Sequence, residues 1–130
     1  MIQLTLKETF EAYLVLKKNH SKEYKHDKDF LGYQLAKLEA STLEPAKLFE
    51  NIRDRLIKEI GVEKDGFTFI PSEKQKEYEE SLNKKLSEIE SEMKEDLTFK
   101  PIKLYHFEKY DVSPEFFIGM GKLIDDTPKS

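Results

Sequence analysis

The most regular pattern in this sequence is SEKQKEYEESLNKKLSEIESEMKE, residues 72–95. Its apolar residues recur at steps of four, four, three and four, and they are Tyr78, Leu82, Leu86, Ile89 and Met93. This spacing predicts a helix with a narrow apolar seam, because steps of three and four return to one helix face. Nearly every other position is polar or charged, so the helix would be marginal alone in water. We therefore expect the seam, which is close to the coiled-coil type, to need a neighbour.

The simplest neighbour is the amphipathic segment that ends at Gly61. Its apolar residues also recur at three and four, and they are Leu48, Phe49, Ile52, Leu56 and Ile60. Gly61 is a helix stop signal, and Ser72 followed by Gln75 predicts a capping box at the start of the next helix. We therefore predict that the two helices fold back on each other as an antiparallel helical hairpin.

The helical pattern before Gly61 begins near residue 29 but contains Pro45. Proline has no backbone N–H and clashes with the preceding turn inside a helix. Two alternatives stay open. The helix kinks near residues 41–45, or one helix ends and another starts with Thr42 as its cap and Pro45 in its first turn.

The remaining segments predict short elements around this hairpin. Thr5 with Glu8 predicts a capping box for a helix that ends near Lys17. Asp65-Gly66 predicts a turn, followed by a β-like stretch at 67–70. We expect that stretch to pair with residues 97–104 as a two-stranded ribbon packed on the helices.

Residues 105–110 predict a short helical turn, and Ser113-Pro114 predicts the start of a last helix. The apolar residues of this helix are Phe116, Phe117, Met120, Leu123 and Ile124. The fold class is thus mainly α (α+β): an antiparallel helical hairpin with a minor two-stranded β-ribbon and a short C-terminal helix. Residues 1–130 fit a single domain, with 125–130 as a flexible tail.

Composition narrows the classes of function. The net charge is −4, from 22 basic and 26 acidic residues, so general nucleic-acid binding is disfavoured. The chain contains no cysteine, which removes disulfides, thiolate metal sites and thiol catalysis together. Its apolar runs are too short for a membrane helix and no signal peptide is visible, so we expect a cytoplasmic protein.

Few residues suggest a catalytic or metal-binding function. His20, His26, Asp27 and Asp29 could offer nitrogen and oxygen ligands to a metal, but their spacing matches no known ligand motif. We therefore prefer a solvated charged loop, and predict no metal and no cofactor. His106 lies among aromatic residues, which favours a partly buried structural role. The carboxylates of residues 77–95 lack a nucleophile or pocket, so no catalytic residue is predicted.

An aromatic group near the end of the chain has two interpretations. Its members are Phe99, Tyr105, Phe107, Tyr110, Phe116 and Phe117. They form either a small satellite core where the ribbon meets the last helix, or a partner-binding surface, because exposed aromatics often anchor interfaces. The second interpretation makes them the candidate contact residues for a protein partner.

Several segments together resemble a group of small tailed-phage proteins of unknown function. The segments are LFENIRDRLIKEIG (48–61), KDG (64–66), IPSEK (70–74), IKL (102–104) and VSPEF (112–116). The resemblance spans residues 6–124 and departs from the group at Pro45 and at the histidine-bearing loop. It implies a phage-encoded factor in virion assembly or host interaction, and it implies no activity and no site residues.

The sequence therefore predicts a non-enzymatic protein-binding factor that acts in virion assembly or structure, through a protein partner or self-association. The first alternative is an inhibitor of a host defence protein, an anti-CRISPR or similar factor, because an acidic protein complements a basic cleft. The second alternative is a metal-dependent hydrolase that uses the histidines and carboxylates described above.

Overall fold

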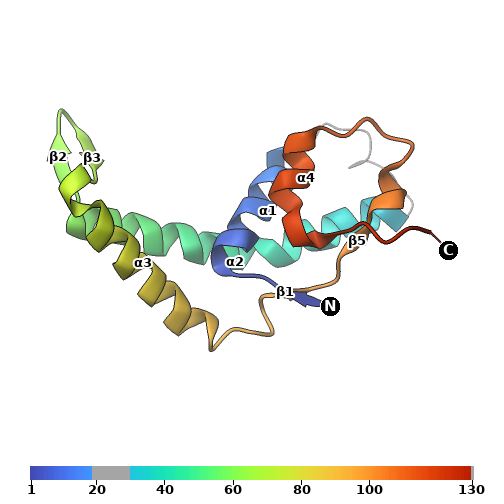
Figure 1. Cartoon of the computed structure of the whole chain (residues 1–130), viewed down its shortest axis with the longest axis horizontal. Coiled ribbons are helices and arrows are strands. Elements are labelled where there is room, and N and C mark those ends of the chain that lie inside the picture. The colour runs from blue at the N-terminus through green and yellow to red at the C-terminus, as the bar shows by residue number, and fades with distance from the viewer. Residues whose placement is uncertain (19–29, 130) are drawn as a thin grey trace.

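The computed structural model describes residues 1–18 and 30–129. In this part of the chain the α-helices are α1 (Leu6–Lys18), α2 (Phe30–Ile60), α3 (Gln75–Glu90) and α4 (Pro114–Met120). α2 runs along the long axis of the molecule (Figure 1). α1 packs on α2, α4 packs on α1, and α3 starts at the C-terminal end of α2. The mainly α prediction is confirmed.

Short strands join distant parts of the chain. β1 (Ile2–Gln3) pairs antiparallel with β4 (Thr98–Phe99), and β5 (Ile102–Lys103) pairs in parallel with β6 (Ile124–Asp125). β2 (Val62–Lys64) and β3 (Phe67–Phe69) form an antiparallel hairpin. The ribbon predicted between residues 67–70 and 97–104 is therefore wrong, because each segment has a different partner.

The predicted Asp65-Gly66 turn sets the pairing of the β2–β3 hairpin. Asp65 and Gly66 have φ values of 53° and 81°, and two consecutive positive φ values are typical of a two-residue hairpin turn. Such a turn places the strand before it directly beside the strand after it. The loss of chain entropy is small for so short a loop. β3 therefore pairs with β2 and not with a strand about thirty residues further along the chain.

α2 continues through Pro45 as one helix, so the alternative of two separate helices is wrong. Pro45 is buried. In the turn before it, two hydroxyls bond back to the helix: Ser41 Oγ donates to the Lys37 carbonyl at 2.9 Å, and Thr42 Oγ1 to the Leu38 carbonyl at 2.8 Å. Thr42 is thus an interior residue with a satisfied hydroxyl, and it does not cap a helix.

Two hydrophobic cores lie along α2. The first core, at its N-terminal half, contains Leu4, Ala12, Leu16, Leu31, Leu35, Leu38, Phe99, Ile102, Phe107, Phe116, Met120 and Leu123. The second core, at its C-terminal half, contains Leu6, Phe49, Ile52, Leu86 and Leu97. α1 contributes to both cores, which fixes α2 to the rest of the molecule near its middle.

The start of α1 is capped twice. The predicted box forms, because the Glu8 N–H donates to Thr5 Oγ1 at 3.1 Å and the Thr5 N–H donates to Glu8 Oε1 at 2.9 Å. Partial burial alone would raise the pKa of Glu8, but the Thr5 bond and the nearby Lys122 ammonium lower it on balance. A second carboxylate, Glu90 from α3, accepts the Leu6 N–H at 2.9 Å.

α3 begins and ends differently from its prediction. It starts after a 3₁₀ turn at Ser72–Lys74, and no side chain caps either start, so the predicted Ser72–Gln75 capping box does not form. It ends at Glu90, and Met93 lies in the turn that follows. Met93 still packs half-buried against the second core.

The predicted start of the last helix is confirmed, since Ser113 Oγ accepts the Phe116 N–H at 3.4 Å. Its predicted end is wrong. The helix stops at Gly121, whose φ of 51° breaks the helical path. Leu123 then lies in a 3₁₀ turn and Ile124 in β6.

We expect Glu90→Ala to lower the free energy of unfolding by about 1 kcal/mol, because it leaves the partly buried Leu6 N–H without an acceptor. Urea denaturation measures this loss. Glu90→Gln keeps an acceptor oxygen and should lose less. Glu92→Ala, two residues further on and exposed, is the matched control. Equal stability of the Glu90→Ala and Glu92→Ala variants would contradict the capping role.

The Lys103–Asp125 ion pair predicts an acid-sensitive contact between β5 and β6. Lys103 Nζ donates to Asp125 Oδ2 at 2.6 Å, and this bond, with two from Thr127, lowers the pKa of Asp125. A lowered pKa contributes stability above the unfolded value of about 3.9, and that contribution is lost as the pH falls through the folded value. The melting temperature of Asp125→Asn should therefore fall less than that of the wild type between about pH 7 and about pH 3. Equal losses would exclude the pair as a source of acid sensitivity.

Candidate functional site

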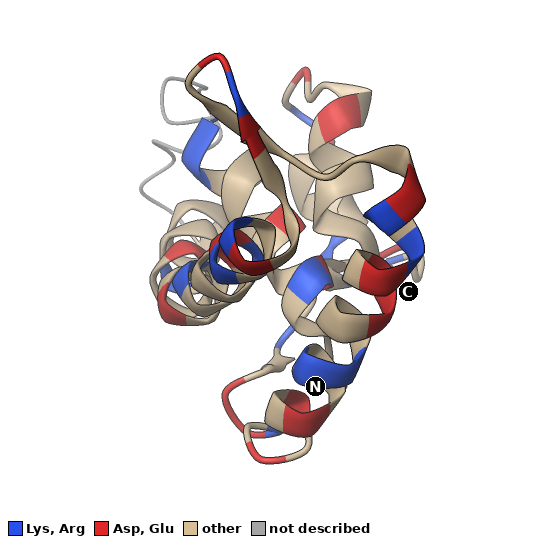
Figure 2. Cartoon of the chain, turned by 90° about the vertical axis from the view of Figure 1, so that its left-hand side faces the viewer, with Lys and Arg blue, Asp and Glu red and all other residues tan. Residues whose placement is uncertain are grey.

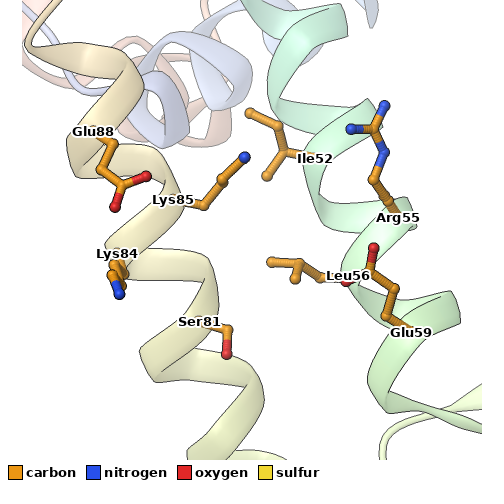
Figure 3. A pocket seen from close by; sticks show the side chains of 8 residues that line it. All are labelled: Ile52, Arg55, Leu56, Glu59, Ser81, Lys84, Lys85 and Glu88. Carbon is orange, nitrogen blue, oxygen red and sulfur yellow. The ribbon is translucent and has the colours of Figure 1, made fainter.

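A hollow of about 390 Å³ lies between α2 and α3. Its lining residues come equally from the two helices and are Ile52, Arg55, Leu56, Glu59, Ser81, Lys84, Lys85 and Glu88. We call it the α2–α3 groove (Figure 3). It lies beside the second core, on the arm that extends away from α1 and α4 (Figure 1).

The floor of the α2–α3 groove is apolar. Ile52 and Leu56 point from α2 toward α3, and Lys85 points back from α3 toward α2 (Figure 3). Ile52 is 7% exposed, whereas Leu56 is only half-buried. The groove therefore leaves apolar surface of α2 within reach of a further chain.

The seam of α3 is incompletely covered. Leu86 is 7% exposed and belongs to the second core, as the hairpin prediction requires. Leu82, Ile89 and Met93 pack against the same core but are only half-buried. α2 thus covers the middle of the seam and leaves its borders accessible, which marks the arm as the part of the described chain best suited to contact a partner.

The rim of the α2–α3 groove carries an excess of positive charge. The lining includes three basic residues, Arg55, Lys84 and Lys85, and two acidic residues, Glu59 and Glu88. The whole chain, by contrast, has a net charge of −4. On the side of the molecule that Figure 2 shows, basic and acidic residues both occur on the helices. The groove is therefore locally more basic than the chain as a whole, which favours acidic side chains on an occupant.

Tyr78, the first residue of the seam, has a perturbed side chain. Partial burial raises the pKa of its phenol and the Asp54 carboxylate raises it further, while Arg53 on α2 opposes both. The phenol is therefore neutral at physiological pH. The Arg53 guanidinium also lies over the Phe10 and Phe49 rings, at 5.3 and 5.9 Å, where it joins α1 and α2 by cation–π contacts.

The β2–β3 hairpin stands at the C-terminal end of α2 (Figure 1) and exposes two aromatic rings. Phe67 is 75% exposed and Phe69 is 44% exposed. The hairpin is held closely, because a Cβ on Gly61 would overlap the carbonyl oxygens of Ile57 and Phe69. Gly61 is thus required at this junction by close backbone approach as well as by the end of α2.

Three of the six predicted aromatic contact residues are buried inside the molecule. Phe99, Phe107 and Phe116 are 4%, 3% and 1% exposed and belong to the first core. Phe107 packs edge-to-face on Phe116 and Phe117, with ring centroids 5.7 and 5.5 Å apart. A partner cannot reach the three buried rings while the core is closed. Partner binding through the half-buried Tyr105, Tyr110 and Phe117 stays a prediction.

The histidine predictions have different outcomes. His106 is partly buried, as predicted, and its ring stacks on that of Tyr105 with centroids 4.7 Å apart. The group formed by His20, His26, Asp27 and Asp29 lies outside the described residues. Within residues 1–18 and 30–129, no three His, Asp or Glu side chains gather closely enough to hold a metal ion.

Comparison with known proteins does not indicate a function for this chain. No protein family, curated protein or solved structure is detectably similar to this chain. Among the described helices, none has both the length and the apolar character needed to cross a bilayer. The resemblance to tailed-phage proteins stays a prediction, and function is inferred from the groove and its surroundings.

We expect alanine substitutions along the seam to lower the free energy of unfolding by unequal amounts. Leu86→Ala should lower the free energy of unfolding by about 2–4 kcal/mol, because Leu86 is buried in the second core. Leu82→Ala, made at a half-buried position of the same seam, should cost clearly less. Urea denaturation measures both values. Equal losses would mean that α2 covers the whole seam and leaves no border for a partner.

Proposed function

We propose that this protein is a non-enzymatic protein-binding factor whose docking site is the α2–α3 groove. The observation that supports this most directly is the half-buried Leu56, which lies beside Ile52 between three basic and two acidic side chains. An apolar floor inside a polar rim is the common arrangement of protein interfaces. The half-buried borders of the α3 seam extend the same surface.

The occupant proposed for the groove is an amphipathic helix with acidic residues beside its apolar stripe. Such a helix places apolar side chains at three- and four-residue steps in a groove between two helices. Its acidic flanks would face Arg55, Lys84 and Lys85. The apolar contacts would supply affinity, while the charges would set orientation and association rate.

The identity of the partner would distinguish two narrower roles of this protein. Our first proposal is a virion assembly or structural component, and the second is an inhibitor of a host defence protein. Capsid or tail proteins bound in the groove would correspond to assembly. A host enzyme bound in equal stoichiometry would correspond to inhibition.

The test is affinity capture from infected and uninfected cell lysates with matched charge reversals. Lys84→Glu with Lys85→Glu reverses two rim charges at exposed positions. Lys76→Glu with Lys94→Glu makes the same charge change at exposed positions that do not line the groove. We expect the wild type and the control to capture the same protein, and the rim variant to bind it at least about tenfold more weakly.

Thermal melting of all three proteins checks that each remains folded. Equal capture by the rim variant and the control would move the docking site away from the groove. Recovery of no protein in near-equal stoichiometry from either lysate would contradict the binding function itself.

A further inference from the structure

The four most exposed aromatic side chains among the described residues lie at two places. Phe67 and Phe69 on the β2–β3 hairpin are 75% and 44% exposed, and Phe30 and Tyr33 at the start of α2 are 52% and 62% exposed. The hairpin stands at one end of the molecule, beyond the C-terminal end of α2 (Figure 1). Exposed aromatic groups commonly anchor interfaces, so each place is a candidate contact surface.

The β2–β3 hairpin presents both of its rings on one face. Neighbouring residues of a strand point to opposite faces, so Phe67 and Phe69 point to the same one. Lys64 pairs with Phe67 across the hairpin and shares this face. Asp65 lies in the turn, two residues before Phe67. The hairpin therefore combines an exposed apolar face with charged groups at its turn.

The second place borders a hollow of about 200 Å³ on the N-terminal half of α2, which we call the α2–β4 cleft. Its lining residues include Phe30 and Tyr33, together with Leu38 of α2 and Phe99 of β4. Leu38 and Phe99 are buried and belong to the first core. An aromatic ring that enters the cleft would contact exposed rings as well as side chains of the core.

The α2–β4 cleft and the hairpin carry opposite charge. Lys37 and Lys100 line the cleft, both are exposed, and no carboxylate is among the lining residues. The hairpin carries two carboxylates, Glu63 and Asp65, and one ammonium group, that of Lys64. The acidic hairpin is therefore attracted to the basic cleft, whereas two hairpins or two clefts would repel each other.

The hairpin cannot reach the cleft of its own molecule. α2 is one helix from Phe30 to Ile60, and at about 1.5 Å of rise per residue it spans about 40 Å between Tyr33 and Ile60. A three-residue strand, at about 3.4 Å per residue, extends only about 10 Å beyond that end. A hairpin ring that enters the cleft must therefore come from another molecule.

We propose that the β2–β3 hairpin of one copy of this protein docks in the α2–β4 cleft of a second copy. Phe67, the more exposed ring, enters the cleft. The carboxylates of the hairpin then face Lys37 and Lys100. An aromatic side chain buries roughly 150–250 Å², so the interface is small. Small interfaces are typical of weak, transient contacts, and the association should depend strongly on concentration.

The proposed contact joins two different surfaces, so it does not end at a dimer. Each copy carries one hairpin and one cleft, at opposite ends of α2. After docking, one copy still has an open cleft and the other an open hairpin. Head-to-tail contacts of this kind continue into a chain or close into a ring. The proposal does not rest on the α2–α3 groove, because none of the groove residues takes part.

Sedimentation velocity of the full chain tests the proposal. The wild type should sediment faster as its concentration rises from low to high micromolar. Phe67→Ser removes the inserted ring and Tyr33→Ser removes a ring of the cleft, each at an exposed position. Each variant alone should associate at least about tenfold more weakly. Ile118→Ser, which removes a 78% exposed side chain from α4, is the matched control and should associate as the wild type does.

A mixture of the two variants distinguishes the head-to-tail contact from other contacts. The Phe67→Ser copy keeps an intact cleft, and the Tyr33→Ser copy keeps an intact hairpin. Equal amounts should therefore form a dimer with one copy of each, which does not grow further because no second matching pair of surfaces remains. Formation of this dimer also shows that both variants are folded.

Three results would overturn the proposal. The first is a wild type that stays monomeric up to high micromolar concentration, in which case the occupant of the cleft would be a different protein. The second is a mixture of the two variants that stays monomeric. The third is a Tyr33→Ser variant that associates as strongly as the wild type, which would indicate contact between two hairpins. None of the substituted residues lines the α2–α3 groove, so the two proposals fail independently.

Discussion

The structure depends on the continuity of α2 across two hydrophobic cores. A helix from Phe30 to Ile60 is too long to be stabilised by one small core, and its two halves are buried separately. The junction falls near Pro45, where the helix loses one backbone hydrogen bond. The buried, self-satisfied hydroxyl of Thr42 and the packing of α1 across both cores hold the helix together at this point.

This arrangement explains why the proposed docking site lies toward the C-terminal end of α2. The N-terminal half of α2 packs against α1, which in turn packs against α4. Near the C-terminal end, α3 and the β2–β3 hairpin pack against α2, and part of Leu56 and of the α3 seam stays accessible. The groove that remains open there is lined by both apolar and charged side chains.

Features encoded by a few adjacent residues were predictable from the sequence, and features that depend on distant residues were not. The Thr5–Glu8 box, the Asp65-Gly66 turn and the Ser113 cap follow local rules and formed as predicted. The pairing of β3 was mispredicted because Val62–Lys64 contains one apolar residue and gave no strand signal. The groove was missed because Arg55, Lys84 and Lys85 look like ordinary solvated positions until α2 and α3 are placed together.

The bond from the Leu6 amide to Glu90, together with the pairing of β1 and β4, ties the first residues to the last third of the chain. During translation, the amino end therefore emerges long before its native contacts exist. At about 5–20 residues per second, the delay lasts several seconds. The β1–β4 pairing and the Leu6–Glu90 bond therefore cannot form until the last third of the chain has been synthesised, so closure of the amino end around Leu4 and Leu6 is completed late in cotranslational folding.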